Sequence, residues 1–250
     1  MSVQISLCIP AYEMHGAGAA MLDAALASVA RQRGCDFEVV IADQARDGSL
    51  EPVCARWVGQ MRLRRIDTTD TARSSAANLN RAIAAARGSI VKILFQDDCL
   101  GPDDALQRIV GTFEDGAVNW TLCGWTDWRD EGAQRHVVPR LNPMLPMGRN
   151  SVGHPSAVAI RRDRAPDFDP AFDWLMDVDY YHRCHQHLGP PAILPEPLVL
   201  IRRHGAQHSL RLDAAQRRAE VRRAMRKHGL GRSPRAWLYY LTRVVLLGHR

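Results

Sequence analysis

Short apolar runs alternate with longer segments of helical periodicity over the first half of the chain. We predict buried strands for four apolar runs, at residues 3–9, 37–42, 61–66 and 90–95. Helices are predicted for the segments that follow these runs, at residues 19–32, 50–60, 74–86 and 103–113. Strands and helices that alternate at this spacing form βαβ units, so this half of the chain is expected to build a parallel sheet.

The second half of the chain is less regular. Residues 124–155 are rich in Trp, Asp, Pro and Gly and are expected to be mostly loop. Further strands are predicted at residues 118–123, 156–161 and 193–201, the last of them interrupted by Pro195 and Pro197. Further helices are predicted at residues 178–188, 213–228 and 234–247.

The composition is that of a globular protein with one sizeable core. The chain has 250 residues, of which 46% are hydrophobic and 24% charged, and this excludes disordered and fibrous classes. No apolar run approaches the ~18 residues of a membrane span, and no apolar segment follows a basic N-terminus. Six cysteines without a C-x-x-C pair indicate reduced thiols, so we expect a cytoplasmic protein.

The net charge of +6 conceals a strong asymmetry. Residues 201–250 hold 13 Lys and Arg against 2 Asp and Glu, whereas residues 1–200 hold 20 against 25. A basic helix followed by an apolar, aromatic-rich one is typical of segments that lie on anionic membranes, so peripheral contact with the inner face of the cell membrane is one expectation for residues 211–250. The alternative is that both helices pack on the body with their arginines in solvent. We expect no nucleic-acid partner, because no nucleic-acid-binding motif accompanies the arginines.

Two adjacent carboxylates, Asp97 and Asp98, follow the fourth predicted strand. Like charges this close repel each other unless a cation lies between them, and hard oxygen ligands suit Mg²⁺ or Mn²⁺. The alternative is a solvated turn or a helix cap. Residues 10–13 and Asp43 follow the first and second strands, and ligands bind at this carboxyl edge of an open parallel sheet.

Four segments resemble the motifs of family 2 glycosyltransferases of the GT-A fold. Residues 5–13 resemble the family's opening V-S-V-I-I-P-x-Y-N, and residues 37–49 resemble its second-strand motif E-I-I-V-V-D-D-G-S-x-D-G-S, one residue shorter. Residues 74–88 resemble the helix that precedes the metal motif, and the Q-D-D of residues 96–98 stands where the family has D-x-D. All four keep the family's order and spacing over residues 3–115.

The resemblance implies an α/β fold of the GT-A (Rossmann-like) type. We expect a mostly parallel sheet flanked by helices, with a helical basic extension at the C-terminus. The expected glycosyltransferase domain spans residues 1–210, with a nucleotide-binding half at 1–115 and an acceptor-binding half at 116–210. Residues 211–250 form the amphipathic helical tail.

The resemblance also implies a nucleotide-diphospho-sugar donor. The nucleotide-binding residues would be Pro10, Ala11, Tyr12, Glu13, Asp43, Arg73 and Asp97. Tyr12 would pack on the base, and Asp43 would accept the imide hydrogen of uracil or thymine, which favours a UDP- or dTDP-sugar. Asn78 and Asn80 are expected to fix the loop before the D-x-D position rather than to touch substrate.

A divalent cation, Mn²⁺ or Mg²⁺, would offset the charge that develops on the departing diphosphate. Its ligands would come from Asp97, Asp98 and His204, with Asp98 on the metal and Asp97 also reaching sugar or ribose hydroxyls. His204 belongs to residues 202–209, which resemble the family's R-x-H-x-x-S/Q-x-S loop over the diphosphate. Arg73 and His204 would contact the diphosphate itself.

Residues 174–183 resemble the family's E-D-x-D-L-x-x-R segment, whose first aspartate is the general base of an inverting transfer. That role would fall on Asp177, but Met176 replaces the preceding Glu, so Asp179 is the alternative base. His154 and Trp174 are expected to bind the acceptor, which would be a sugar or a lipid-linked molecule. Two other functions stay open: a catalytically degenerate protein that binds a nucleotide sugar, and a binder of nucleic acid or anionic surfaces through the tail.

Overall fold

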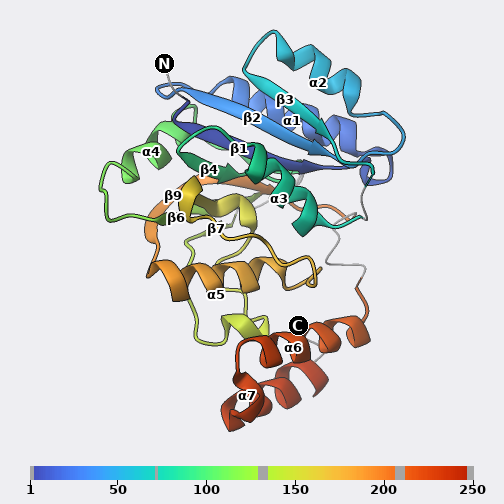
Figure 1. Ribbon diagram of the computed structural model, residues 1–250, viewed down its shortest axis with the longest axis vertical. Helices are drawn as coiled ribbons and strands as arrows, with labels where there is room; N and C mark the ends of the chain where they lie inside the picture. Colours follow the sequence, from blue (N-terminus) through green and yellow to red (C-terminus); the bar gives the residue numbers. More distant parts are fainter. Residues whose placement is uncertain (1–2, 71–72, 129–134, 206–211, 247–250) are drawn as a thin grey trace.

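A single curled sheet with helices on both faces forms the body of the protein (Figure 1). The computed structural model describes residues 3–70, 73–128, 135–205 and 212–246. The α/β fold expected from the sequence is present, and the last two helices of the chain lie together at one end of the molecule (Figure 1).

The first half of the chain builds the parallel half of the sheet. Its strands are β1 (Ile5–Ala11), β2 (Phe37–Asp43), β3 (Leu63–Asp67) and β4 (Ile90–Ile93). They pair in the order β3-β2-β1-β4, and each of these pairings is parallel. The helices are α1 (Gly18–Ala30), α2 (Glu51–Val58), α3 (Ser75–Ala85) and α4 (Ala105–Thr112). Every strand and helix predicted for this half is confirmed, with small differences at the ends.

The sheet separates two apolar layers, because alternate residues of a strand point to opposite faces. Ile5, Leu7 and Ile9 of β1 belong to a cluster with residues of α1, α2 and α4. Cys8 of the same strand belongs to a second cluster, which contains residues of α3. All of β1 is buried, as expected for a central parallel strand that is covered on both faces.

The second half of the chain adds strands of mixed direction. They are β5 (Cys99–Leu100), β6 (Trp120–Trp128), β7 (His136–Val137), β8 (Val158–Arg161) and β9 (Ala192–Arg202). β8 lies antiparallel between β4 and β6, while β6 and β9 run parallel. β5 and β7 are antiparallel to β9 and β6, respectively. The expectation of a mostly parallel sheet therefore holds for the first four strands, and the remainder is mixed.

β9 is one continuous strand, although the sequence predicts an interruption at its two prolines. The pairing of β6 with β9 shifts register at Gly124, so that Cys123 lies opposite Leu194 and Gly124 lies opposite Pro197. A β-bulge of this kind tolerates residues that cannot donate to the ladder. Glycine is required there, because a side chain at position 124 would collide with the carbonyl oxygen of Pro195.

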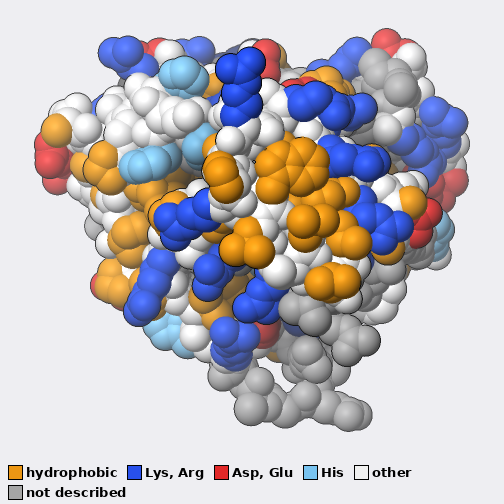
Figure 2. Space-filling view, turned by 90° about the horizontal axis from the view of Figure 1, so that it is seen from below, with side chains coloured by type: hydrophobic (Ala, Val, Ile, Leu, Met, Phe, Trp, Pro, Cys, Tyr) orange, Lys and Arg blue, Asp and Glu red, His pale blue; other side chains and the backbone are white. Residues whose placement is uncertain are grey.

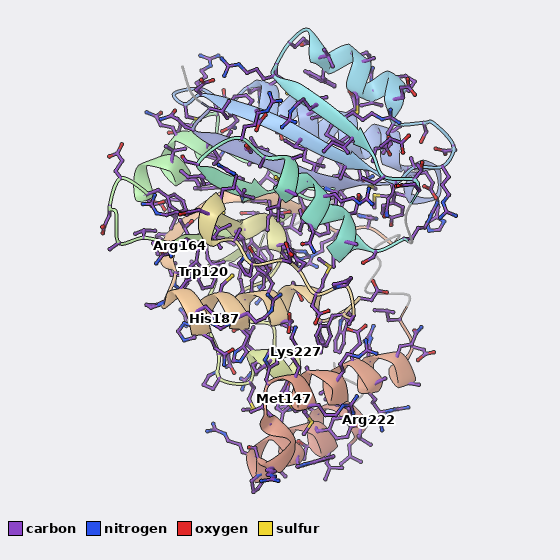
Figure 3. All side chains as sticks on the ribbon, viewed as in Figure 1. Trp120, Met147, Arg164, His187, Arg222 and Lys227 are labelled. Atoms are coloured by element: carbon purple, nitrogen blue, oxygen red, sulfur yellow. The ribbon has the colours of Figure 1, made fainter. Side chains whose placement is uncertain are left out.

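Helix α5 (Met176–Leu188) covers the second half of the sheet, and Figure 3 places Trp120 of β6 between the sheet and this helix. Tyr180, Tyr181 and Cys184 of α5 are fully buried in the same cluster as Trp120. Single turns of 3-10 helix occur at several places along the described residues: η1 (Met14–Gly16), η2 (Leu145–Met147), η3 (Pro155–Ala157), η4 (Arg162–Arg164) and η6 (Leu230–Arg232).

The basic C-terminal region packs on the body through its first helix, α6 (Ala214–Lys227). A capping box starts this helix, since the side chains of Asp213 and Gln216 each accept the other's backbone N–H. The apolar stripe of α6 is buried in the cluster that contains α5, and its residues are Val221, Ala224 and Met225.

The chain ends in α7 (Pro234–Tyr239), which continues as the π-helical segment η7 (Tyr240–Leu246). Within the described residues, no helix combines the length and the apolar character that crossing a bilayer requires. The boundary that we expected between residues 210 and 211 lies outside the described residues.

The two halves of the sheet meet at a buried polar junction around Ser156. Lys92 of β4 is fully buried, and its Nζ donates to the carbonyl oxygens of Ser156 and Val158. The Ser156 hydroxyl donates to Oδ2 of Asp98 at 2.6 Å and accepts the N–H of Phe95 at 2.9 Å. Asp98 also accepts the N–H of Arg202, at the end of β9, at 3.3 Å. The segment after β4 is thereby tied both to the segment before β8 and to β9.

Removing the Ser156 hydroxyl should therefore destabilise the whole domain. We expect Ser156→Ala to lower the free energy of unfolding by about 2 kcal/mol, because it leaves Oδ2 of the buried Asp98 carboxyl group and the N–H of Phe95 each without the Ser156 hydroxyl as a hydrogen-bond partner. Urea unfolding measures this change. The control is Ser89→Ala, whose exposed hydroxyl donates to the Gln4 carbonyl oxygen at 3.1 Å and should be worth less than about 1 kcal/mol. Equal losses in the two variants would contradict a special role for the junction.

Candidate active site

A cavity of about 370 Å³ opens at the carboxyl ends of β1 and β4. Its wall is formed by the loops after these strands, the start of α3, the residues at the start of η3 and the start of α5. It gathers residues that the sequence singled out from distant segments: Pro10, Ala11, Tyr12, Arg73, Asp97, Asp98, His154, Trp174 and Asp177. Glu13, Asp43, Asp179 and His204, which the structure also describes, lie outside this wall.

The side chain of Gln96 holds the loop after β1 in place. Its Oε1 accepts the N–H of Tyr12 at 2.6 Å, and its Nε2 donates to the Tyr12 carbonyl oxygen at 2.9 Å. An amide both accepts and donates, whereas the carboxylate that the family has here only accepts. Sequence reasoning identified Gln96 only as a departure from D-x-D, because its partner lies far away along the chain.

Asn78 and Asn80 hold the backbone of neighbouring loops, but not the loop before residues 96–98 as the sequence predicts, and Asn78 also lines the cavity. Asn78 donates to the carbonyl oxygen of Ala42 at 2.8 Å and accepts the hydroxyl of Thr68 at 2.8 Å, which ties the end of β2 to the loop after β3. Asn80 exchanges two hydrogen bonds with the backbone of Phe168, at 2.8 and 2.7 Å.

Glu13 forms an ion pair with Arg73, which lines the cavity. The structure therefore gives Glu13 a contact with the expected diphosphate-binding arginine rather than a place in the cavity wall.

Asp43 is buried, and both of its carboxylate oxygens are engaged. Oδ1 accepts the N–H of Ala45 at 2.8 Å, and Oδ2 accepts from Nε of Arg65 at 2.7 Å. The neighbouring Gln44 lines the cavity instead. The geometry thus does not support the expected contact between Asp43 and a base, because Asp43 lies outside the cavity wall and Gln44 lies in it.

The acidic pair after β4 divides into one buried and one accessible carboxylate. Asp98 is 3% exposed and is bound to Ser156 and the Arg202 backbone, so its strongest contacts are within the protein. Burial and the charge of Asp97 raise the pKa of Asp98 well above its ordinary value. Oδ2 of Asp97 lies 2.9 Å from Nε2 of His204. The structure thus favours Asp97, rather than the expected Asp98, as the acid that is open to a ligand.

Among the described residues, no group of three or more His, Cys, Asp or Glu side chains lies close enough to hold a metal ion. Asp97 and His204 form a pair, and Nδ1 of His204 is buried with no hydrogen-bond partner among the described groups. Mg²⁺ is commonly held by one or two protein ligands together with substrate phosphates and water. The pair therefore fits a cation whose coordination is completed by substrate.

Asp177 lies where a second cavity, of about 530 Å³, adjoins the first. The walls of both cavities include His154, Trp174 and Asp177. Oδ2 of Asp177 accepts from the side-chain amide of Asn150 at 2.7 Å, and Oδ1 accepts the N–H of Val178 at 2.7 Å. Burial outweighs these hydrogen bonds and raises the pKa of Asp177 to about 7. A carboxylate with this pKa can accept a proton near neutral pH.

The second cavity is also lined by Trp125 and Arg203. The rings of Trp125 and His154 meet edge to face with their centroids 5.5 Å apart. Burial and the nearby Arg203 lower the pKa of His154 to about 4, so its imidazole is neutral at physiological pH. An aromatic wall beside a few hydrogen-bonding side chains is suited to binding a sugar ring.

Asp179 has a different environment from Asp177, although both are in the first turn of α5. It is 1% exposed and forms ion pairs with Arg183 and Lys227, at 2.8 Å each, and a contact with His228 at 3.0 Å. Burial opposes its ionisation, but these partners prevail and lower the pKa of Asp179 to about 2. Of the two bases left open by the sequence, only Asp177 lies in a cavity wall.

The carboxyl groups of Asp177 and Asp179 should therefore titrate at widely different pH values. We expect Asp177 to titrate near pH 7 and Asp179 to stay ionised down to about pH 2. Carboxyl-¹³C NMR measures both, and Asp177→Asn assigns the first signal by removing it. The raised pKa also affects stability. Because the pKa of Asp177 is higher in the folded state, this carboxyl group makes folding less favourable as pH rises from about 4 towards 7. Asp177→Asn should therefore gain stability relative to the native chain over that range, and a midpoint near pH 4 for Asp177 would contradict the assignment.

Comparison with known proteins agrees with this geometry. A sequence model described as glycosyl transferase family 2 matches residues 6–171. An uncharacterized protein of Mycobacterium tuberculosis, MT1568, is 27% identical over 237 residues, which cover 85% of this chain and 71% of that protein.

Two solved structures have the same fold. S. aureus TarS 1–349 in complex with UDP-GlcNAc superposes with a TM-score of 0.66 at 14% identity, over 90% of this chain and 66% of that one. The mannosyltransferase PcManGT from Pyrobaculum calidifontis, in complex with GDP-Man and Mn²⁺, gives 0.63 at 20% identity, over 95% and 67%. This chain therefore spans about two thirds of the length of either structure, and at these identities the likeness shows the GT-A fold. Because the family match runs from β1 to the segment before α5 and the fold agrees with it, we conclude that this chain belongs to glycosyl transferase family 2.

Proposed function

We propose that this protein is an inverting glycosyltransferase that moves a hexosyl group from a nucleotide-diphospho-sugar to an acceptor hydroxyl. The observation that carries the proposal is that the two cavities share one titratable carboxylate, Asp177. In this arrangement the donor occupies the cavity at the carboxyl ends of β1 and β4, and the acceptor enters through the second cavity. A general base between two substrates is the requirement of an inverting transfer.

The proposed donor is a UDP- or dTDP-sugar. Tyr12 and Gln44 lie in the wall of the first cavity, where an aromatic ring and a primary amide suit a nucleobase. The amide of Gln44 both accepts and donates, which matches the adjacent N3–H and O4 of uracil or thymine. TarS, in complex with UDP-GlcNAc, and PcManGT, in complex with GDP-Man, support a nucleotide-sugar donor of this general kind.

The diphosphate would lie near Arg73 and Asp97. Arg73 lines the cavity and carries a fixed positive charge, while its partner Glu13 orients it from outside the wall. Asp97 and His204 would hold Mn²⁺ or Mg²⁺, which supplies Lewis-acid stabilisation of the departing diphosphate when it is bound. Asp98 would serve this site indirectly, through the hydrogen bonds that fix the segment after β4.

The proposed transfer exchanges one bond at the anomeric carbon and moves one proton. The acceptor oxygen attacks the anomeric carbon, the bond from that carbon to the diphosphate oxygen breaks on the opposite face, and the acceptor proton moves to a carboxylate oxygen of Asp177. The hydrogen bond from Asn150 orients the Asp177 carboxylate. His154 and Trp174, which line both cavities, would position the acceptor ring next to it.

Two substitutions separate donor binding from turnover. We expect Asp177→Asn to lower the rate of nucleoside diphosphate release by roughly 10²–10⁴-fold while UDP binding is unchanged, because only proton acceptance is lost. Asp97→Asn should instead weaken Mn²⁺-dependent UDP binding. Release from UDP-GlcNAc, dTDP-glucose and GDP-mannose, with and without sugar acceptors, measures turnover, and thermal shift with UDP, dTDP and GDP measures binding.

The control for both variants is Asp115→Asn, an exposed aspartate in the turn after α4. A saturating nucleotide at about 100 times its Kd should raise the Tm by roughly 5–10 °C for a chain of this size. If no nucleotide raises the Tm with or without Mn²⁺, the glycosyltransferase proposal fails. Nucleotide binding without turnover on any donor or acceptor would favour a catalytically degenerate nucleotide-sugar-binding protein.

We also propose that the C-terminal end of the molecule contacts an anionic membrane, where a lipid-linked acceptor would be found. Five large apolar side chains of α7 and η7 are exposed: Trp237, Leu238, Leu241, Val245 and Leu246. Figure 2 shows hydrophobic side chains gathered on this end of the molecule with Lys and Arg side chains around them. Exposed arginines in and next to these two elements are Arg232, Arg235 and Arg243. An apolar face bordered by cations matches the chemistry of an anionic lipid surface.

Sedimentation with lipid vesicles tests the membrane contact. We expect binding to phosphatidylglycerol vesicles, weaker binding to phosphatidylcholine vesicles, and a loss of binding at high salt. The double variant Leu238→Ser/Leu246→Ser should lower the affinity at least roughly ten-fold, since these side chains are 63% and 76% exposed and would insert. Val58→Ser on α2, which is 57% exposed away from this face, is the matched control. Equal binding of both variants, or no binding to either vesicle, would contradict the contact.

A further inference from the structure

Helix α6 lies along the segment that leads into the base-bearing helix α5. Lys227 pairs with Asp169 at 2.7 Å, and Arg223 donates to the carbonyl oxygen of Ala171. The guanidinium of Arg217 lies 5.4 Å from the ring centroid of Trp174. One face of α6 therefore contacts the incoming segment from residue 169 to residue 174, and Figure 3 places Lys227 between α5 and α6.

The centre of this contact is the carboxylate of Glu220. Its Oε1 accepts the N–H groups of Asp173 and Trp174, both at 3.1 Å. Its Oε2 accepts the N–H groups of Trp174 and Leu175, at 3.0 and 2.8 Å. Glu220 is also the only acidic residue after Asp213 in a region dominated by arginine. One side chain from the C-terminal region thus satisfies three successive backbone donors next to the active site.

These three donors lie immediately before the first turn of α5. Leu175 is the N-cap residue of α5, and its apolar side chain cannot accept a hydrogen bond from the helix. Trp174 lines both cavities, and Asp177 lies in the first turn of α5. The direction in which the helix presents Asp177 therefore depends on how the segment of residues 173–175 is held.

We propose that Glu220 is a positioning residue for the transfer reaction: its carboxylate holds residues 173–175 so that Trp174 and Asp177 face the shared wall of the two cavities. The inference rests on the proposed function, because it takes Asp177 as the base. The inference gives α6 a part in the active site that no sequence motif indicates. A misplacement of a reacting group by about 1 Å costs up to roughly 100-fold in rate, so loss of this contact should be visible in turnover.

The negative charge of Glu220 also acts on Asp177, since it adds to the increase in the pKa of that carboxyl group. Other titratable or charged groups beside Asp177 or in the walls of the two cavities are Tyr181, His154, Asp173, Arg203, Arg135, His15, Arg73, Asp97 and Asp98. None of these changes in a Glu220 variant. Burial is the main cause of the raised pKa of Asp177, so a general loss of packing would lower this pKa as well. The variant Glu220→Asp, which keeps the charge, separates the two causes.

Three full-length variants test the proposal. Glu220→Gln removes the charge and one strong acceptor, Glu220→Asp keeps the charge but shortens the reach, and Arg222→Gln on the same helix is the matched control. Figure 3 places Arg222 on the outer side of α6, and the residue is exposed. Amide hydrogen exchange of residues 173–178 should accelerate at least roughly ten-fold in both Glu220 variants and stay unchanged in Arg222→Gln.

The Asp177 titration and turnover supply the second readout. We expect the midpoint of Asp177, measured by carboxyl-¹³C NMR, to move to lower pH in Glu220→Gln and to stay near the native value in Glu220→Asp. The kcat for nucleoside diphosphate release should fall roughly ten- to 100-fold in both, with the KM of the donor within about two-fold, because Tyr12, Gln44 and Arg73, which would bind the nucleotide, lie outside the affected segment.

Native exchange of residues 173–178 and a native kcat in Glu220→Gln would overturn the proposal. Faster exchange with an unchanged kcat would overturn it as well, since the contact would then be structural only. If the native chain releases no nucleotide from any donor, the proposed function fails separately. Exchange and the Asp177 titration do not depend on turnover, so they still show whether Glu220 holds this segment.

Discussion

The arrangement of the site depends on the buried polar junction at the end of β4. Lys92, Ser156 and Asp98 join the parallel half of the sheet to the mixed half through hydrogen bonds that water cannot reach. An uncompensated charge in such a place is costly, so the three groups stabilise the fold only when all are in register. Because Ser156 follows His154 by two residues, this register also decides where His154 enters the cavities. The two cavities are held against each other by the same contacts that hold the sheet together.

The first turn of α5 shows how one helix gives two aspartates different chemistry. Successive residues of an α-helix are rotated by about 100°, so residues two positions apart face nearly opposite directions. Asp177 faces the cavities, where burial raises its pKa to about 7. Asp179 faces Arg183 and Lys227, where ion pairs lower its pKa to about 2. The first environment suits proton transfer, whereas the second fastens α5 to α6.

Within the C-terminal region, α6 packs on the body of the protein, whereas α7 and η7 expose apolar side chains to solvent. α6 buries its apolar stripe and directs Glu220 and Lys227 at the segment around α5. α7 and η7 expose apolar side chains on the opposite side of this region. In the proposed function, α6 positions the helix that carries the base. The helices that would meet the membrane, α7 and η7, follow α6 in the chain. Of the two expectations that the sequence raised for this region, packing on the body is seen for α6. Contact with a membrane stays a prediction.

The sequence by itself determined the alternation of strands and helices in the first half of the chain, because that pattern is set by local periodicity and by nearby glycines. It also placed Tyr12, Asp97, Trp174 and Asp177 at the site, since each follows or precedes a recognisable element. Only the tertiary structure showed that Asp177 and Gln44, and not Asp179 and Asp43, line a cavity, and that Gln96 and Glu220 bind distant backbone segments. These outcomes depend on burial and on partners that are distant along the chain, such as the pairing of Glu220 with residues 173–175. Local pattern carries no information about such contacts, so they emerge only when the chain is folded.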